Sequence, residues 1–121
     1  MHESIDNRIT ELKEIALQIY NAIEIKDHGY FPYARTKLLS LIENQGKLEL
    51  EISHQHMTRS QGYDAWIIRL LIDLQQWRGP DARQYKLLLR EYQAYFRGKV
   101  NTGKLAENVN PMWQAIRGIG D

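Results

Sequence analysis

The chain has 121 residues, a length that fits a single domain with one continuous core, so we expect one domain spanning residues 1–121. Hydrophobic residues make up 43% of the chain and charged residues 26%, a composition that excludes a wholly disordered protein. There is no cysteine, which excludes disulfides, thiolate metal sites and cysteine nucleophiles, and the formal net charge is only +1.

The N-terminal sequence and the apolar segments bear on where the protein acts. Residues 1–6 are acidic and polar, which is the wrong chemistry for a signal peptide. The longest apolar-rich stretch, residues 65–74, contains Arg69 and Asp73 and is too short and too charged to span a bilayer. We therefore expect a cytoplasmic protein that has no membrane partner.

A helix is predicted over residues 5–27. Aliphatic residues recur there at alternating spacings of four and three, which places them on one narrow stripe: Ile5, Ile9, Leu12, Ala16, Ile19 and Ile23. Asp6 complements the helix dipole at the start, and Gly29 suits the position just past the end. A stripe this narrow is similar to a coiled-coil seam, and it favours a bundle within one chain or one shared with a second chain.

The second predicted element begins at Pro32, which suits the first turn of a helix. Apolar residues follow at helical spacing from Leu38 onward, but Gly46 interrupts the pattern, and residues 47–52 then alternate with period two, as in a strand. A lone strand would leave its backbone groups unpaired, and no other segment alternates convincingly. We therefore predict that the helix continues, with a kink, to about Met57, with a strand over residues 47–52 as the alternative.

Two further helices are predicted after Ser60-Gln61-Gly62, a run that interrupts the chain. The first presents a broad apolar face and ends at Gly79-Pro80; its face consists of Trp66, Ile67, Leu70, Leu71, Leu74 and Trp77. The second follows Asp81, a capping residue, and closes at Gly98; its face consists of Tyr85, Leu88, Leu89, Tyr92, Tyr95 and Phe96. Because these aromatic residues share one face, core packing is favoured over base stacking.

The end of the chain completes the predicted architecture. Residues 101–103, Asn-Thr-Gly, predict a loop, and a short helix is then marked by Asn110 as cap, Pro111 at the first position and Gly118 beyond its end. The predicted fold class is all-α: an antiparallel helical bundle of four main helices plus a short C-terminal helix. The residues at the centres of the apolar stripes are expected to be buried: Ile9, Leu12, Ile19, Leu70, Leu71, Leu74, Leu88 and Tyr92.

Charge is distributed unevenly along the chain. Residues 1–58 contain six Lys/Arg and nine Asp/Glu, whereas residues 59–121 contain ten and six. Four cations share one face of the helix at about 82–97, opposite its apolar face, and we call them the basic stripe: Arg83, Lys86, Arg90 and Arg97. Such a row can contact successive phosphates of a nucleic acid, pair with an acidic protein surface, or form a solvated face.

The histidines and one short resemblance bear on possible chemistry. His54 and His56 would diverge on a helix, and no third ligand follows at a recognisable spacing, so we expect no metal and no cofactor. Residues 56–60 are similar to the phosphorylated segment of histidine phosphotransfer domains, although Ser60 stands where that family has glycine.

Residues 5–12 resemble the first helix of helical chorismate mutases. That resemblance implies a pocket of converging cations, for which Arg8, Arg35 and Lys37 are candidates, although their positions do not match the later motifs of the family. No phosphate-binding loop or catalytic triad is recognisable, so an enzyme is less favoured than a binding protein and we predict no catalytic residues.

The sequence therefore favours a non-catalytic helical interaction module that acts as an accessory, adaptor or regulatory subunit of a larger partner. The seam-like first helix and the opposite charge balances of the two halves predict association with a protein partner or with a second copy as a homodimer. The alternative function is a nucleic-acid-binding protein that contacts phosphates through the basic stripe.

Overall fold

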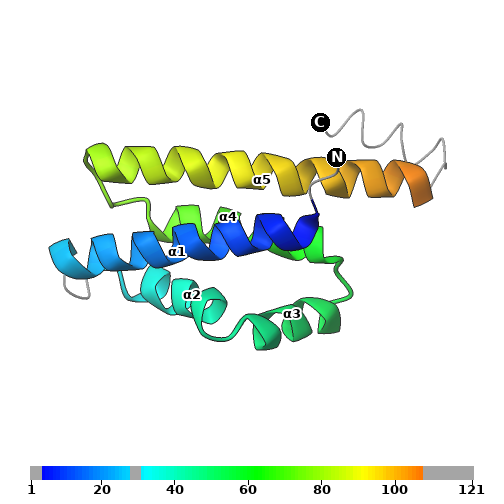
Figure 1. Ribbon diagram of the computed structural model, residues 1–121, viewed down its shortest axis with the longest axis horizontal. Helices are drawn as coiled ribbons and strands as arrows, with labels where there is room; N and C mark the ends of the chain where they lie inside the picture. The colour runs from blue at the N-terminus through cyan, green and yellow to red at the C-terminus, as the bar shows by residue number, and fades with distance from the viewer. Residues whose placement is uncertain (1–3, 28–30, 108–121) are drawn as a thin grey trace.

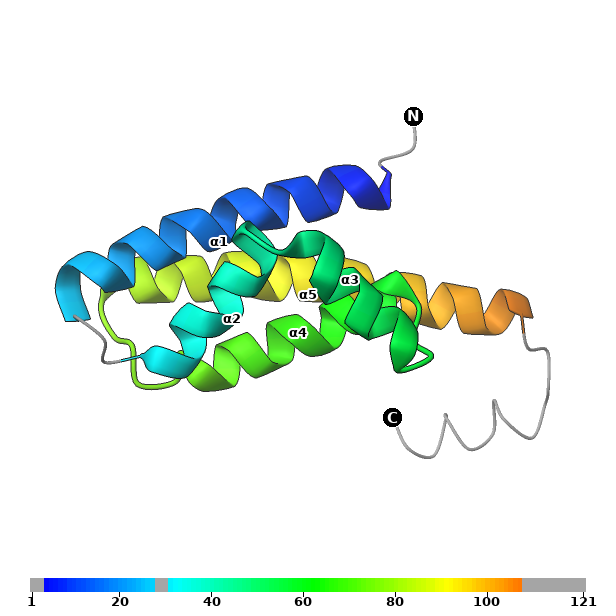
Figure 2. The ribbon, with the colours of Figure 1, turned by 90° about the horizontal axis from the view of Figure 1, so that it is seen from below.

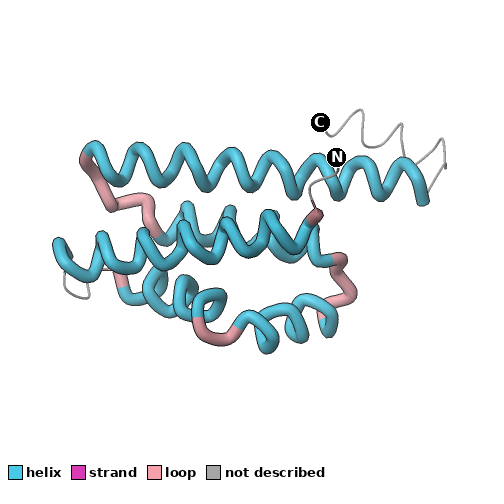
Figure 3. Tube along the Cα trace, viewed as in Figure 1, coloured by secondary structure: helices cyan, strands magenta, loops and turns pink. Residues whose placement is uncertain are grey.

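The computed structural model describes residues 4–27 and 31–107, and all of its elements are helices (Figures 1 and 3). There are five of them in the described residues: α1 (Ile5–Asp27), α2 (Pro32–Ile42), α3 (Gln45–His54), α4 (Arg59–Asp73) and α5 (Pro80–Glu107). The all-α prediction is confirmed for these residues. The predicted C-terminal helix, with Trp113, lies outside them.

The helices form three layers. α1 and α4 lie in the middle, and α5 runs along both of them on one side, antiparallel to each (Figures 1 and 2). The shorter helices α2 and α3 cover the opposite side, where both contact α4 and α2 also packs on α1. The long helices thus form a three-helix base, and α2 and α3 form an arm over α4.

The core lies where the apolar stripes meet. Of the residues expected to be buried, five are fully enclosed: Ile9, Leu12, Ile19, Leu70 and Leu74. The other three, Leu71, Leu88 and Tyr92, are half-buried and pack against the edge of the core. Phe96 is enclosed and its ring stacks on that of Tyr63, with centroids 5.5 Å apart, so core packing of the aromatic face is confirmed for Phe96.

The arm consists of two helices where the sequence predicted one kinked helix. α2 ends at Ile42, and α3 begins after Asn44, whose backbone is not helical (φ −132°). Asparagine favours such backbone because its side chain competes with helical hydrogen bonds. Residues 47–52 are helical, so the strand alternative is wrong.

Two other boundaries also differ from the prediction. Ser60, Gln61 and Gly62 lie in the first turn of α4, because Thr58 caps that helix and forms a capping box with Gln61. α5 continues through Gly98 and residues 101–103 to Glu107, where the sequence predicted a stop and a loop. A glycine inside a helix costs only about 1 kcal/mol, and the well-packed turns before Gly98 outweigh that cost.

α4 and α5 differ from the prediction at the turn between them. α4 ends at Asp73, so Trp77 lies in the connection to α5, where it is buried. α5 begins at Pro80, which places Asp81 in its first turn and not at the capping position. Gly79 has a φ of +113°, a backbone conformation that glycine adopts without a steric cost.

α3 ends in a Schellman motif with a histidine at the left-handed position. His56 has a φ of 60°, and its N–H donates to the Ser53 carbonyl while the Met57 N–H donates to the Ile52 carbonyl. Left-handed backbone costs a non-glycine residue about 1–2 kcal/mol. We therefore expect His56→Gly to stabilise the protein by about 1 kcal/mol, as a higher melting temperature in thermal unfolding.

The control for this change is His54→Gly, two residues earlier and inside the last turn of α3. Glycine there should destabilise the protein by up to about 1 kcal/mol, since there is no left-handed backbone at this position for glycine to relieve. Equal effects at the two positions would contradict the assignment of the motif.

Candidate protein-interaction groove

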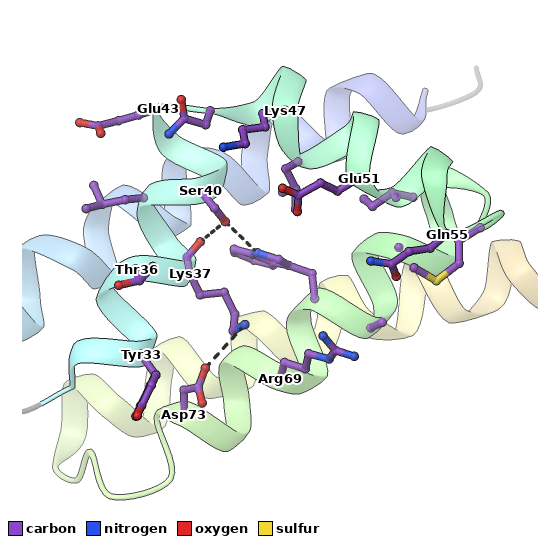
Figure 4. Close-up of a pocket in the computed structure, with 18 residues that line it drawn as sticks. Tyr33, Thr36, Lys37, Ser40, Glu43, Lys47, Glu51, Gln55, Arg69 and Asp73 are labelled. Carbon is purple, nitrogen blue, oxygen red and sulfur yellow. Dashed lines mark hydrogen bonds and ion pairs between the residues drawn. The ribbon is translucent and has the colours of Figure 1, made fainter.

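A groove of about 950 Å³ runs between the arm and α4 (Figure 4). Apolar side chains from α2, α3, the following turn and α4 line it: Leu39, Leu48, Ile52, Met57, Ala65 and Trp66. Charged side chains of both signs surround this lining: Lys37, Glu43, Lys47, Glu51, Arg69 and Asp73. An apolar floor with a charged rim is the anatomy of a protein-binding surface.

Two contacts tie α2 to α4 across the groove. The Lys37 ammonium lies 3.8 Å from the Asp73 carboxylate, and the Trp66 indole N–H donates to the Ser40 hydroxyl at 3.4 Å. Figure 4 shows the Lys37–Asp73 pair at the end near Tyr33, whereas Glu51 and Gln55 lie toward the other end. The groove is therefore bridged between α2 and α4 at the end near Tyr33.

Close packing of α3 on α4 closes the far end of the groove. A Cβ atom at Gly62 would lie 2.5 Å from the Ile52 Cδ1 atom, so only glycine lets the two helices approach this closely. The sequence alone predicts that Gly62 interrupts the chain, whereas the structure makes it a packing position.

A polar network fixes α3 on the face away from the groove. The Arg59 guanidinium donates two hydrogen bonds to the Glu49 carboxylate, at 2.8 and 3.2 Å, and also pairs with Asp6 of α1 at 2.8 Å. The Tyr63 hydroxyl and the Gln45 amide donate to Glu49 as well, at 2.8 and 3.0 Å. Glu49 therefore joins the wall of the groove to α4, and through Arg59 to α1.

The environment of Glu49 shifts the ionisation of both Glu49 and Tyr63. Partial burial by itself raises the pKa of the Glu49 carboxyl, but the hydrogen bonds from Arg59, Gln45 and Tyr63 outweigh burial and leave the pKa below its ordinary value. Burial, and then the hydrogen bond to Glu49, raise the pKa of the Tyr63 hydroxyl far above its ordinary value. Glu49 is thus held as a carboxylate and Tyr63 as a neutral donor at physiological pH.

Acid should therefore weaken the contacts through which Glu49 holds α3 against α4. Since the folded pKa of Glu49 lies below its unfolded value, its contribution to stability is complete above the unfolded value, about 4.5, and is lost as the pH falls through the folded pKa. We expect Glu49→Gln to flatten the pH dependence of stability between pH ~5 and ~3, as measured by urea unfolding at a series of pH values. The control is Glu43→Gln, an exposed carboxylate on the same arm. If the two variants lose the same pH dependence, Glu49 is not the group responsible.

The four cations of the basic stripe lie in two different environments. The Arg97 guanidinium donates to the Asp64 carboxylate at 2.7 Å, and the Lys86 ammonium donates to the Trp77 carbonyl at 2.6 Å. Arg83 and Arg90 lie exposed on the outer face of α5. Burial, and then the nearby charges of Arg78 and Arg90, lower the pKa of Lys86. The cationic surface therefore lies at the start of α5 and includes Arg78, which the sequence analysis did not single out.

The two family resemblances gain no support from the described residues. His56 follows the end of α3 in a left-handed conformation, whereas the phosphotransfer family carries its histidine within a helix. Three cations considered for a mutase-like pocket contact different helices. Arg8 lies over the Tyr92 and Tyr95 rings of α5, Arg35 lies over the Tyr20 ring of α1, and Lys37 pairs with Asp73 of α4.

Several absences hold for the described part of the chain. Within residues 4–27 and 31–107, no group of three or more His, Asp or Glu side chains could hold a metal ion. In the same residues, no helix is both long and apolar enough to cross a membrane. Comparison with protein-family models, with curated proteins and with solved structures gave no match for this chain.

Proposed function

We propose that the chain is a non-catalytic helical interaction module that holds one amphipathic helix of a larger partner protein in the groove between the arm and α4. It would act as an accessory, adaptor or regulatory subunit of that partner. The observation that supports this most strongly is the groove itself, about 950 Å³, with an apolar floor contributed by three helices and the turn after α3. Helix-in-groove binding needs such a surface.

The groove is lined by residue types that are common in protein interfaces. Tyr33, at one mouth of the groove, is 78% exposed and so presents its ring to a partner. Trp66 and Arg69 line the groove as well, and Trp, Tyr and Arg are the residue types enriched at the centres of protein interfaces. The charged rim of both signs would orient a partner helix more than it would add affinity.

The test compares two alanines on different faces. Ala65 lines the groove, whereas Ala94 is exposed on α5. We expect Ala65→Arg to weaken binding of the purified partner, recovered with the tagged chain from its own cells, by about 100-fold or more, because the interface would bury an unpaired charge. Ala94→Arg should bind like the original chain. Equal affinities of the two variants for the partner would overturn the proposal, and circular dichroism would verify that both are folded.

A second candidate is the binding of nucleic-acid phosphates by the start of α5. It is favoured by the exposed guanidinium groups of Arg78, Arg83 and Arg90, which lie near the Lys86 ammonium at the start of α5. Binding to random DNA or RNA should then weaken with salt, and Arg83→Ser with Arg90→Ser should flatten the slope of log affinity against log salt by roughly two units for a duplex. No binding at low salt would eliminate this candidate.

A further inference from the structure

Residues 110–118 have the sequence of a short amphipathic helix. Asn110, Pro111 and Gly118 mark its ends, and Met112, Trp113 and Ile116 would share one face. Arg117 is the only charged residue among these nine. Helices shorter than about 12 residues are marginal in water by themselves, so such a segment needs an apolar surface to form.

The groove offers a surface of matching size and chemistry. It extends along α4 from Gly62 to Asp73, roughly 16 Å at 1.5 Å per residue, whereas a nine-residue helix is roughly 14 Å long. Its lining is apolar, and Glu43 and Glu51 on the arm provide carboxylates that a lone arginine could reach. The segment is thus complementary to the groove in length, in apolarity and in charge.

The end of α5 also lies on the correct side of the molecule. Both ribbon views place Glu107, where α5 ends, at the end of the molecule where α3 and its turn into α4 lie (Figures 1 and 2). This is the end at which Gln55 and Met57 line the groove, away from the Lys37–Asp73 bridge. A chain that reverses after Glu107 therefore lies at the α3 end of the groove, opposite the Lys37–Asp73 bridge.

We propose that residues 110–118 fold back as a short helix into the groove of their own chain, with Trp113 and Ile116 on the apolar floor and Arg117 toward Glu43 at the end of α2. This rests on the proposed function only in taking the groove as a helix-binding surface. The consequence is autoinhibition, because a partner helix must displace the segment before it can bind. The apparent affinity for the partner is then the intrinsic affinity multiplied by the fraction of time for which the groove is empty.

The absence of cysteine allows a direct test in the full chain. Ala65→Cys places a single thiol in the groove, and Ala94→Cys places one on the outer face of α5. If the segment occupies the groove for nine-tenths of the time, Trp113→Ser with Ile116→Ser should accelerate alkylation of the thiol at position 65 by about tenfold. The same double change should leave alkylation at position 94 unaltered. An unaltered rate at position 65 would overturn the proposal.

A second thiol identifies the occupant. With Ala65→Cys and Met112→Cys in one chain, mild oxidation at low micromolar protein should give a monomer with an internal disulfide, because position 112 shares the face of Trp113 and Ile116. A disulfide-linked dimer would show that a second copy fills the groove, and it would overturn the proposal. Failure of this inference leaves the Ala65→Arg binding test untouched, because a groove that no internal segment covers still binds a partner. Conversely, the thiol tests require no partner.

Discussion

Gly62→Ala should destabilise the protein by about 1–3 kcal/mol, measured as the free energy of unfolding in urea. The added methyl would lie 2.5 Å from the Ile52 Cδ1 and Cγ2 atoms, so α3 and α4 would have to move apart. Alanine is otherwise the better helix former, by about 1 kcal/mol, so a loss of stability reports the steric conflict and not helix propensity.

Two variants make this prediction specific. Gly98 lies in α5, where a methyl group would meet no described atom within 4 Å apart from the backbone of its own helix and its chain neighbours, so Gly98→Ala should stabilise the protein by about 0.5–1 kcal/mol. Ile52→Ala removes the atoms that a methyl group at position 62 would meet, and the double variant should lose less stability than the two single changes added together. If Gly62→Ala and Gly98→Ala changed stability in the same direction, the close approach of α3 to α4 would be wrong.

Arg97→Ala should also be costly, at about 1–3 kcal/mol, although Arg97 itself is half-exposed. Its partner Asp64 is 8% exposed, and the second carboxylate oxygen of Asp64 has no hydrogen-bond partner among the described residues. Removal of Arg97 would leave a carboxylate in a largely apolar environment without its nearest cation. The effect therefore comes from desolvation of Asp64 and not from the surface ion pair as such.

The controls come from the same helix. Arg90→Ala removes an exposed arginine of the same stripe and should change stability by less than about 0.5 kcal/mol. Adding Asp64→Asn to Arg97→Ala should recover part of the loss, because a neutral amide costs less to bury than a carboxylate. Equal unfolding free energies for Arg97→Ala and Arg90→Ala would show that Arg97 belongs to the solvated stripe.

Most of the fold follows from hydrophobic periodicity. The alternating four–three spacing of residues 5–23 predicts α1 and its enclosed face, and the spacing in α4 predicts the fully buried Ile67 and Leu70 but not the fully buried Tyr63.

Two predicted boundaries are wrong at glycines: a helix was expected to begin after Gly62 and another to close at Gly98, and both residues lie inside helices. Gly46, where a kink was expected, lies in α3, and the break comes before it at Asn44. None of the three glycines has the left-handed backbone that commonly ends a helix.

The groove could not be predicted from the sequence in the same way. Its lining comes from α2, α3, the turn after α3 and α4, and their relative placement depends on the break at Asn44 and on Gly62. Periodicity shows that Trp66 and Leu48 are apolar positions of helices, but not that they line one shared groove. Exposed aromatic residues such as Tyr33 are visible as a binding surface only once burial is known.

For the basic stripe, the sequence predicts the shared helix face but not the contacts that its residues make. Spacing places Arg83, Lys86, Arg90 and Arg97 on one face of a helix, which is how α5 carries them. Spacing alone does not reveal that Arg97 reaches Asp64 of α4 or that Lys86 reaches the Trp77 carbonyl. Asp64 comes within reach through the packing of α4 on α5, and the Trp77 carbonyl through the turn that joins the two helices.

The most direct test of the groove as a binding surface is the NMR spectrum of the methyl groups with and without the partner. We predict that binding shifts the resonances of Leu48, Ile52, Met57 and Ala65, which line the groove. The methyl groups of Leu87 and Ala94, exposed on α5, should stay in place. Shifts centred on Leu87 and Ala94, with unchanged groove resonances, would contradict the account and move the interaction surface to the outer face of α5.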